Sequence, residues 1–125
     1  MIHLGRFFRS LKHALRGVSV VFAAEQSFQI QVYVAFLVLV LGIFFRVRTY
    51  EWIVLVLLTG SVLTLELINS TVERIVDSFR PRIHPIVKDI KDIMAGAVLI
   101  VSVIAAAVGI TIFYPHFAQL VSLLR

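Results

Sequence analysis

The sequence contains no cysteine and few charged residues. Of its 125 residues, 15% are charged and 60% are hydrophobic. The absence of cysteine excludes disulfide bonds and thiolate metal sites. The apolar share is too high for a small soluble domain, and the length is too short for a large polytopic protein. We therefore expect an integral membrane protein of one domain.

Glycine-rich loops that bind phosphate are also missing. The six glycines form neither the Walker motif nor the glycine-rich loop of the soluble kinases. The net charge is +5, but no basic stretch has the aromatic or glycine pattern of a base-reading surface. Nucleic acid is therefore not expected as a partner. The basic residues are instead expected to face anionic lipid.

Three apolar stretches are long enough to cross a bilayer. We expect spans at residues 28–45, 52–77 and 92–114, the second continuing as a helix beyond the hydrocarbon. In residues 4–24, apolar side chains recur at helical spacing between basic ones. This pattern predicts an amphipathic helix that lies in the membrane interface. No small-residue cleavage site follows an apolar run there, so we expect the segment to be retained.

Prolines and basic residues predict the connections and the orientation. Pro81 and Pro85 indicate a structured loop before the third span, and Tyr114, Pro115 and His116 are expected to end that span. Nine of the twelve lysines and arginines lie before the first span or between the hydrocarbon part of the second span and the third span. Because positive residues gather on the cytoplasmic side, the amino terminus and the proline-containing loop are expected in the cytoplasm.

A polar stripe interrupts the second span. Glu66, Asn69, Glu73 and Asp77 fall within about 80° of one another on a helix. Glu66 and Glu73 are two turns, or about 10 Å, apart, so Glu66 lies deeper in the membrane. A charge near the bilayer centre costs at least about 2.5 kcal/mol, so the stripe indicates a functional site. The alternative is that these groups only hydrogen-bond neighbouring helices.

The predicted topology gathers several acids and a lysine at one membrane face. Glu25 alone is typical of a solvated helix end, but it joins Glu73, Lys91 and Asp92 there. Mg²⁺ takes one or two protein carboxylates plus substrate phosphates, and a lysine can neutralise phosphate. A deeper carboxylate such as Glu66 could take a proton from an alcohol in the bilayer. These residues suit phosphoryl transfer to a lipid hydroxyl, and a cation or proton pathway stays open.

The polar stripe also carries a family resemblance. The run from Glu66 to Asp77, ELINSTVERIVD, is similar to the signature of the small prokaryotic diacylglycerol kinase and undecaprenol kinase family. Lys91-Asp92 with the following AGAVL resembles the second motif of that family, and Glu25 with Phe28 resembles the third. The resemblance implies an all-α membrane protein with three transmembrane helices and an N-terminal amphipathic surface helix, assembled as a homotrimeric helical bundle.

The resemblance implies a role for each matching residue. Glu66 corresponds to the general base, which also contacts the lipid, and Glu25 and Glu73 correspond to carboxylates that hold Mg²⁺ and ATP. The other implied residues contact nucleotide (Lys91, Asp92, His84, His13 and Arg6), contact lipid (Arg6) or give polar support (Asn69 and Asp77).

The implied activity is transfer of the γ-phosphoryl group of Mg-ATP to a membrane lipid alcohol, at the cytoplasmic face of a bacterial cell membrane. The His84-Pro85 pair and the AGAV form of the second motif favour undecaprenol as acceptor, with diacylglycerol as the alternative. Gln29 departs from the arginine common in the family, and Gln31 stands where a charged or imidazole side chain is usual. This departure keeps a non-enzymatic class open: an ion or proton conduit, or a degenerate regulator.

Overall fold

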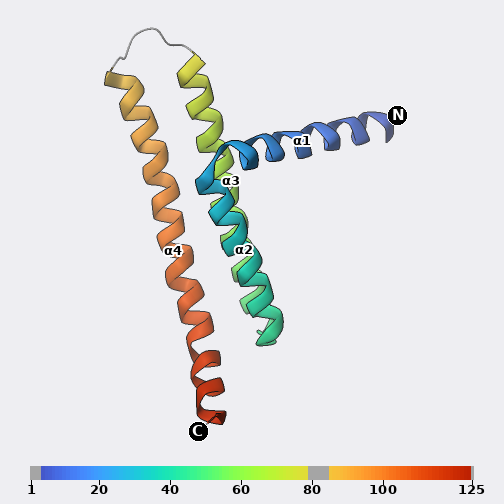
Figure 1. Ribbon diagram of the computed structural model, residues 1–125, viewed down its shortest axis with the longest axis vertical. Helices are drawn as coiled ribbons and strands as arrows, with labels where there is room; N and C mark the ends of the chain where they lie inside the picture. Colours follow the sequence, from blue (N-terminus) through green and yellow to red (C-terminus); the bar gives the residue numbers. More distant parts are fainter. Residues whose placement is uncertain (1–3, 79–84, 125) are drawn as a thin grey trace.

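The computed structural model describes residues 4–78 and 85–124, which form four helices (Figure 1). These helices are α1 (Leu4–Ala24), α2 (Gln26–Phe44), α3 (Thr49–Ser78) and α4 (Pro85–Leu123). Helices α2, α3 and α4 run side by side as a bundle, and α1 projects away from it. Within the described residues there is no strand. The predicted all-α fold is confirmed.

Helix α1 is amphipathic and covers the range expected for the surface helix. Most of its apolar side chains are exposed in the single chain, with Phe8 64% and Leu15 63% exposed. Val21, near its carboxyl end, is the one buried residue of the helix. An apolar stripe opposite basic side chains is stable where a membrane interface covers it.

Helices α2, α3 and α4 are each long and apolar enough to cross a membrane. In their most apolar windows, only 17%, 22% and 0% of the residues, respectively, are buried inside the chain. Most of their apolar side chains therefore point outwards, as they do when lipid is the solvent. The helical form satisfies the backbone hydrogen bonds without water.

Helix α4 is longer than the predicted third span. It begins at Pro85, so the expectation that this proline belongs to a loop is wrong. Pro85 occupies the first helical position, where its missing N–H leaves no intrahelical bond unmade. Pro115 lies inside α4 and does not end it, because neighbouring groups in membrane helices compensate for the lost bond. Pro81 and His84 lie outside the described residues.

A tight connection joins α2 to α3. The backbone N–H of Val47 donates to the Gly42 carbonyl at 3.1 Å, and Arg46 has a φ of 51°. Glu51, in the first turn of α3, accepts a 2.7 Å hydrogen bond from the Arg48 backbone N–H. A glutamate at this position satisfies one of the free donors of the helix amino terminus. His116 Nε2 of α4 lies 3.7 Å from the same Glu51 oxygen. Glu51 therefore has a structural role at this end of the bundle, far along α3 from Glu66.

The apolar core lies at the same end of the bundle as this connection. Val47, Leu55 and Phe113 are buried there, with Trp52 packed against them. Gly42 of α2 lies directly against the Trp52 ring: a Cβ at position 42 would be 2.7 Å from Cη2 and 2.8 Å from Cζ2. Only a residue without a side chain allows α2 and α3 to approach this closely.

We therefore expect Gly42→Ala to lower the free energy of unfolding by about 1–3 kcal/mol, because the added methyl group overpacks the core. Denaturant titration in mixed micelles measures the change. Gly109→Ala is the matched control, since a Cβ there meets nothing within 4 Å. Equal stability of both variants would contradict the close approach of α2 and α3.

Candidate active site

Glu25 lies at the corner between α1 and α2. Its backbone is extended, with φ −124° and ψ 113°, and it is the N-cap residue of α2. An acidic N-cap side chain usually accepts a hydrogen bond from the first turn of its own helix. The Glu25 side chain makes no such bond. It is therefore free to reach another helix.

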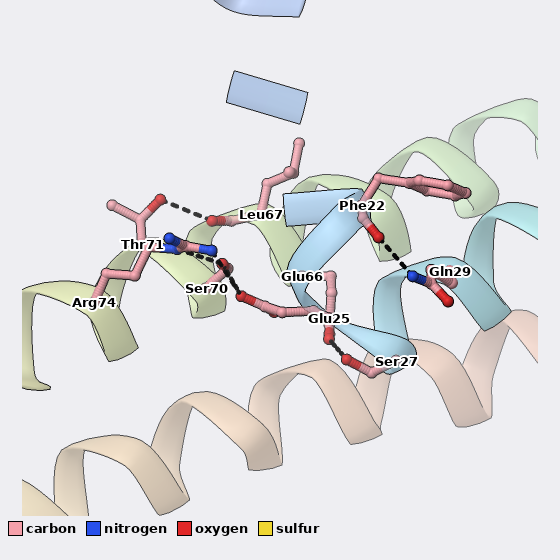
Figure 2. A network of polar contacts seen from close by, with 9 residues as sticks. All are labelled: Phe22, Glu25, Ser27, Gln29, Glu66, Leu67, Ser70, Thr71 and Arg74. Atoms are coloured by element: carbon pink, nitrogen blue, oxygen red, sulfur yellow. Dashed lines mark hydrogen bonds and ion pairs between the residues drawn. The ribbon is translucent and has the colours of Figure 1, made fainter. Parts of the chain in front are cut away.

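The Glu25 carboxylate binds α3 (Figure 2). The fully buried Ser70 donates its hydroxyl hydrogen bond to Glu25 Oε1. Arg74, one turn further along α3, places Nη2 3.8 Å from the same oxygen and Nε 3.4 Å from Ser70 Oγ. The guanidinium is about half exposed, with 49% of its side-chain area accessible, so this ion pair is partly screened by solvent.

The Glu66 carboxylate binds α2. Ser27 Oγ donates to Glu66 Oε1 at 2.5 Å, and Gln31 Nε2 donates to Glu66 Oε2 at 3.2 Å. Glu66 is only 4% exposed. Both donors are neutral, so this acid is held in place by hydrogen bonds and not by an ion pair. A buried carboxylate needs such partners because water no longer solvates it.

The two acids therefore form a reciprocal pair of contacts between α2 and α3. Glu25 at the start of α2 binds Ser70 on α3, and Glu66 on α3 binds Ser27 on α2. Ser27 follows Glu25 by two residues, and Ser70 follows Glu66 by one helical turn. Figure 2 shows both contacts close together at the α1–α2 corner. One polar cluster thus contains both carboxylates.

A second polar contact joins α3 to α4. Lys91 Nζ lies 3.2 Å from Asp77 Oδ1 and 3.3 Å from Oδ2. Asp77 therefore orients Lys91 toward the polar end of α3, and Asp92 follows it as an exposed side chain. Asn69 is 8% exposed, but among the described residues its Oδ1 has no hydrogen-bond partner. The donors to Glu66 are thus Ser27 and Gln31, not Asn69.

The residues predicted on α1 lie apart from this cluster. Arg6 and His13 are exposed on α1, whose amino-terminal part projects away from the bundle (Figure 1). Within one chain they do not meet Glu66. His84 falls outside the described residues, so its predicted nucleotide contact remains a prediction.

Comparison with known proteins identifies the family of this membrane protein. Residues 12–113 match the family model described as prokaryotic diacylglycerol kinase. The chain belongs to the prokaryotic diacylglycerol kinase family. It is therefore a lipid kinase, an enzyme that transfers a phosphoryl group to an alcohol. The matched range contains the whole cluster from Glu25 to Asp92 and leaves Arg6 outside.

The names of curated relatives in the family specify two different phosphoryl acceptors. An undecaprenol kinase from Bacillus subtilis is 38% identical over 112 residues, covering 90% of this chain and 91% of the relative. A diacylglycerol kinase from Synechocystis is 31% identical over 112 residues, covering 89% of this chain and 64% of the relative. A Helicobacter pylori diacylglycerol kinase is 33% identical over 95 residues, covering 76% and 74%.

Glu25 and Glu73 carry carboxylate oxygens, which are suitable ligands for Mg²⁺. Glu73 lies one turn beyond Ser70 on α3, is half-buried and has no hydrogen bond or ion pair to the described residues. Glu25 uses Oε1 for its contacts to Ser70 and Arg74. The described residues contain no cluster of three histidine, cysteine or acidic side chains. Two carboxylates with further ligands from phosphate and water fit the way Mg²⁺ is usually bound.

Several residues of the cluster were not among the predicted site residues. They are Ser27, Gln31 and Arg74, together with Ser70, which the motif contains without a role. Ser27 and Gln31 are four residues apart at the start of the first span, so helical periodicity places them on one face. The helical spacing of these two polar residues was the signal in the sequence that could have identified them as site residues. Gln29, by contrast, donates to the Phe22 carbonyl at 2.7 Å and fastens α2 to the end of α1.

Proposed function

We propose that this protein is an ATP-dependent kinase that transfers the γ-phosphoryl group of Mg-ATP to the hydroxyl of undecaprenol. The observation that carries the proposal is Glu66, a carboxylate 4% exposed within a membrane-spanning helix and one turn from the Ser70–Glu25 contact. The undecaprenol kinase relative supports this acceptor. Diacylglycerol is the second candidate, because two further relatives are named diacylglycerol kinases.

In the proposed reaction, Glu66 is the general base. It takes the proton of the lipid hydroxyl while the hydroxyl oxygen forms a bond to the γ-phosphorus. The bond from the γ-phosphorus to the bridging oxygen breaks, and ADP leaves. Ser27 and Gln31 hold the carboxylate during this step. Proton transfer by a positioned base typically contributes a rate factor of about 10² to 10⁴.

The membrane-surface end of the cluster is the proposed nucleotide site. Glu25 and Glu73 would hold Mg²⁺, which supplies charge neutralisation on the phosphates when bound. Lys91, oriented by Asp77, provides a cation for phosphate, and Asp92 lies next to it. Positioning and charge neutralisation account for most of the acceleration in phosphoryl transfer. This arrangement brings a water-soluble donor to a lipid acceptor at the interface.

The proposed location is the bacterial cytoplasmic membrane, with the amino terminus and the active site on the cytoplasmic side. Nine of the twelve lysines and arginines on that side support this orientation. A homotrimer is the proposed assembly. It is consistent with the position of α1, which projects from its own bundle and keeps the exposed Arg6 and His13 apart from Glu66 of the same chain.

An acceptor assay tests the proposal. Purified protein in mixed micelles receives radiolabelled ATP, Mg²⁺ and either undecaprenol or diacylglycerol, and the labelled lipid is measured. We expect transfer to both alcohols, with the higher kcat/KM for undecaprenol. A higher value for diacylglycerol reverses the acceptor assignment. Transfer to no alcohol, in protein that is folded by circular dichroism, indicates a non-enzymatic membrane component.

Glu66→Gln is expected to lower kcat by about 100-fold or more, because the amide cannot accept the hydroxyl proton. The KM for ATP should stay near that of the original protein, since Glu66 lies deeper than the nucleotide site. Glu51→Gln makes the same chemical change in the first turn of α3, far from Glu66, and serves as the control. Near-normal turnover of Glu66→Gln excludes it as the base.

Glu25→Ala and Glu73→Ala are expected to raise the Mg²⁺ concentration for half-maximal activity by about tenfold or more, or to abolish activity. The control is Asp89→Ala, which removes an exposed acid of α4. Activity is measured over a Mg²⁺ titration at saturating ATP. Titration curves that coincide with that of the control would contradict metal binding by these two carboxylates.

A further inference from the structure

An apolar cavity lies beside the acidic cluster, between α2, α3 and α4. Its volume is about 600 Å³, and it extends from Ile30 and Gln31 to Phe113 and Phe117. The lining is almost entirely apolar, including Ala35, Val62 and Leu63. Gln31 is therefore a polar side chain at one end of a hydrocarbon-like space. That end is the one where α2 meets Glu66.

Gln31 is the lining residue that also contacts Glu66. Its Nε2 donates to Glu66 Oε2 at 3.2 Å, and Ser27, one turn earlier on α2, donates to the other carboxylate oxygen. Each carboxylate oxygen has two lone pairs, so these two bonds leave acceptor sites free on Glu66. The carboxylate is thus fixed in direction and still able to accept a further hydrogen.

The carbonyl oxygen of the Gln31 amide lacks a hydrogen-bond partner among the described residues. This atom, Oε1, is buried. Buried carbonyl oxygens in folded proteins are nearly always paired, and an exception calls for a physical reason. The oxygen lies on a side chain shared by the cavity and the Glu66 contact. A hydroxyl group with an apolar chain has the chemistry to satisfy it.

We propose that Gln31 binds the hydroxyl of the lipid alcohol and, with Ser27, positions Glu66 to take its proton. The inference rests on the proposed function and names the residues that bring acceptor and base together. The hydroxyl first donates to Gln31 Oε1, next to the carboxylate that Gln31 Nε2 holds. The first part of the hydrocarbon chain lies in the cavity. The proton then passes to Glu66 as the hydroxyl oxygen bonds to the γ-phosphorus and ADP leaves.

The test compares Gln31→Leu, which removes the amide NH2 donor and the carbonyl acceptor at similar volume, with Gln119→Leu on the exposed carboxyl-terminal part of α4. We expect Gln31→Leu to lower kcat/KM for the lipid alcohol by about 100-fold, the size expected for a misplaced reacting group. The KM for ATP should not change. A kcat/KM for lipid equal to that of the Gln119→Leu control overturns the inference and leaves the proposed function standing.

Ser27 is tested by a loss and a rescue. Ser27→Ala should lower kcat with both KM values unchanged, and Ser27→Thr should restore it, because threonine keeps the hydroxyl donor. The control is Ser61→Ala, since the Ser61 hydroxyl donates only within its own helix, to the Leu57 carbonyl at 2.7 Å. If the alanine and threonine variants lose kcat equally, the hydroxyl does not position Glu66.

Folding is measured in parallel by size-exclusion chromatography and circular dichroism. If Gln31→Leu does not fold, Gln31→Asn replaces it, because it keeps the amide and withdraws it by one methylene group. A lower kcat/KM for lipid at equal folded amount supports the inference, and the original value overturns it. A matching rise in the KM for ATP also overturns it, since that change indicates a general structural role. If the unmodified protein transfers no phosphoryl group to a lipid alcohol, the proposed function itself is wrong.

Discussion

The burial of a carboxylate inside a membrane span is the constraint on which the polar half of this structure depends. Glu66 lies where neither water nor lipid can solvate its charge. Such a group is stable only when protein donors replace the lost water. The donors, Ser27 and Gln31, come from α2, so α2 must lie against α3 at this depth. The register of the two helices thus follows from the need to hydrogen-bond one acid.

The two ends of the bundle are stabilised by different interactions. At one end, Gly42 admits the Trp52 ring, and apolar side chains pack around it. At the other end, Glu25, Ser70 and Arg74 join the helices through polar contacts. The separation suits a kinase of the membrane interface. The end that meets nucleotide in the proposed reaction carries charge, and the end in the far half of the bilayer holds the helices together by packing.

A kinase without a glycine-rich phosphate loop must hold phosphate in another way. In this chain the available groups are side chains at helix ends, namely Lys91 with its Asp77 partner and the carboxylates proposed to bind Mg²⁺. These groups come from three helices, so their arrangement depends on helix packing. In the proposed reaction the lipid substrate needs no soluble cleft, because the apolar cavity beside Gln31 lies within the membrane-spanning bundle.

The sequence alone determined the helices, the spans and the polar stripe, because hydropathy and the helical period are properties of neighbouring residues. It misjudged α4, since whether Pro85 begins a helix and Pro115 interrupts one depends on which backbone donors are already free. It predicted Glu25 and Glu66 as site residues but not their hydrogen-bond partners. Only the tertiary structure decided that Ser70 binds Glu25 and that Ser27 and Gln31 bind Glu66. Periodicity gives the face of a helix, whereas a hydrogen bond between helices depends on their relative position and rotation.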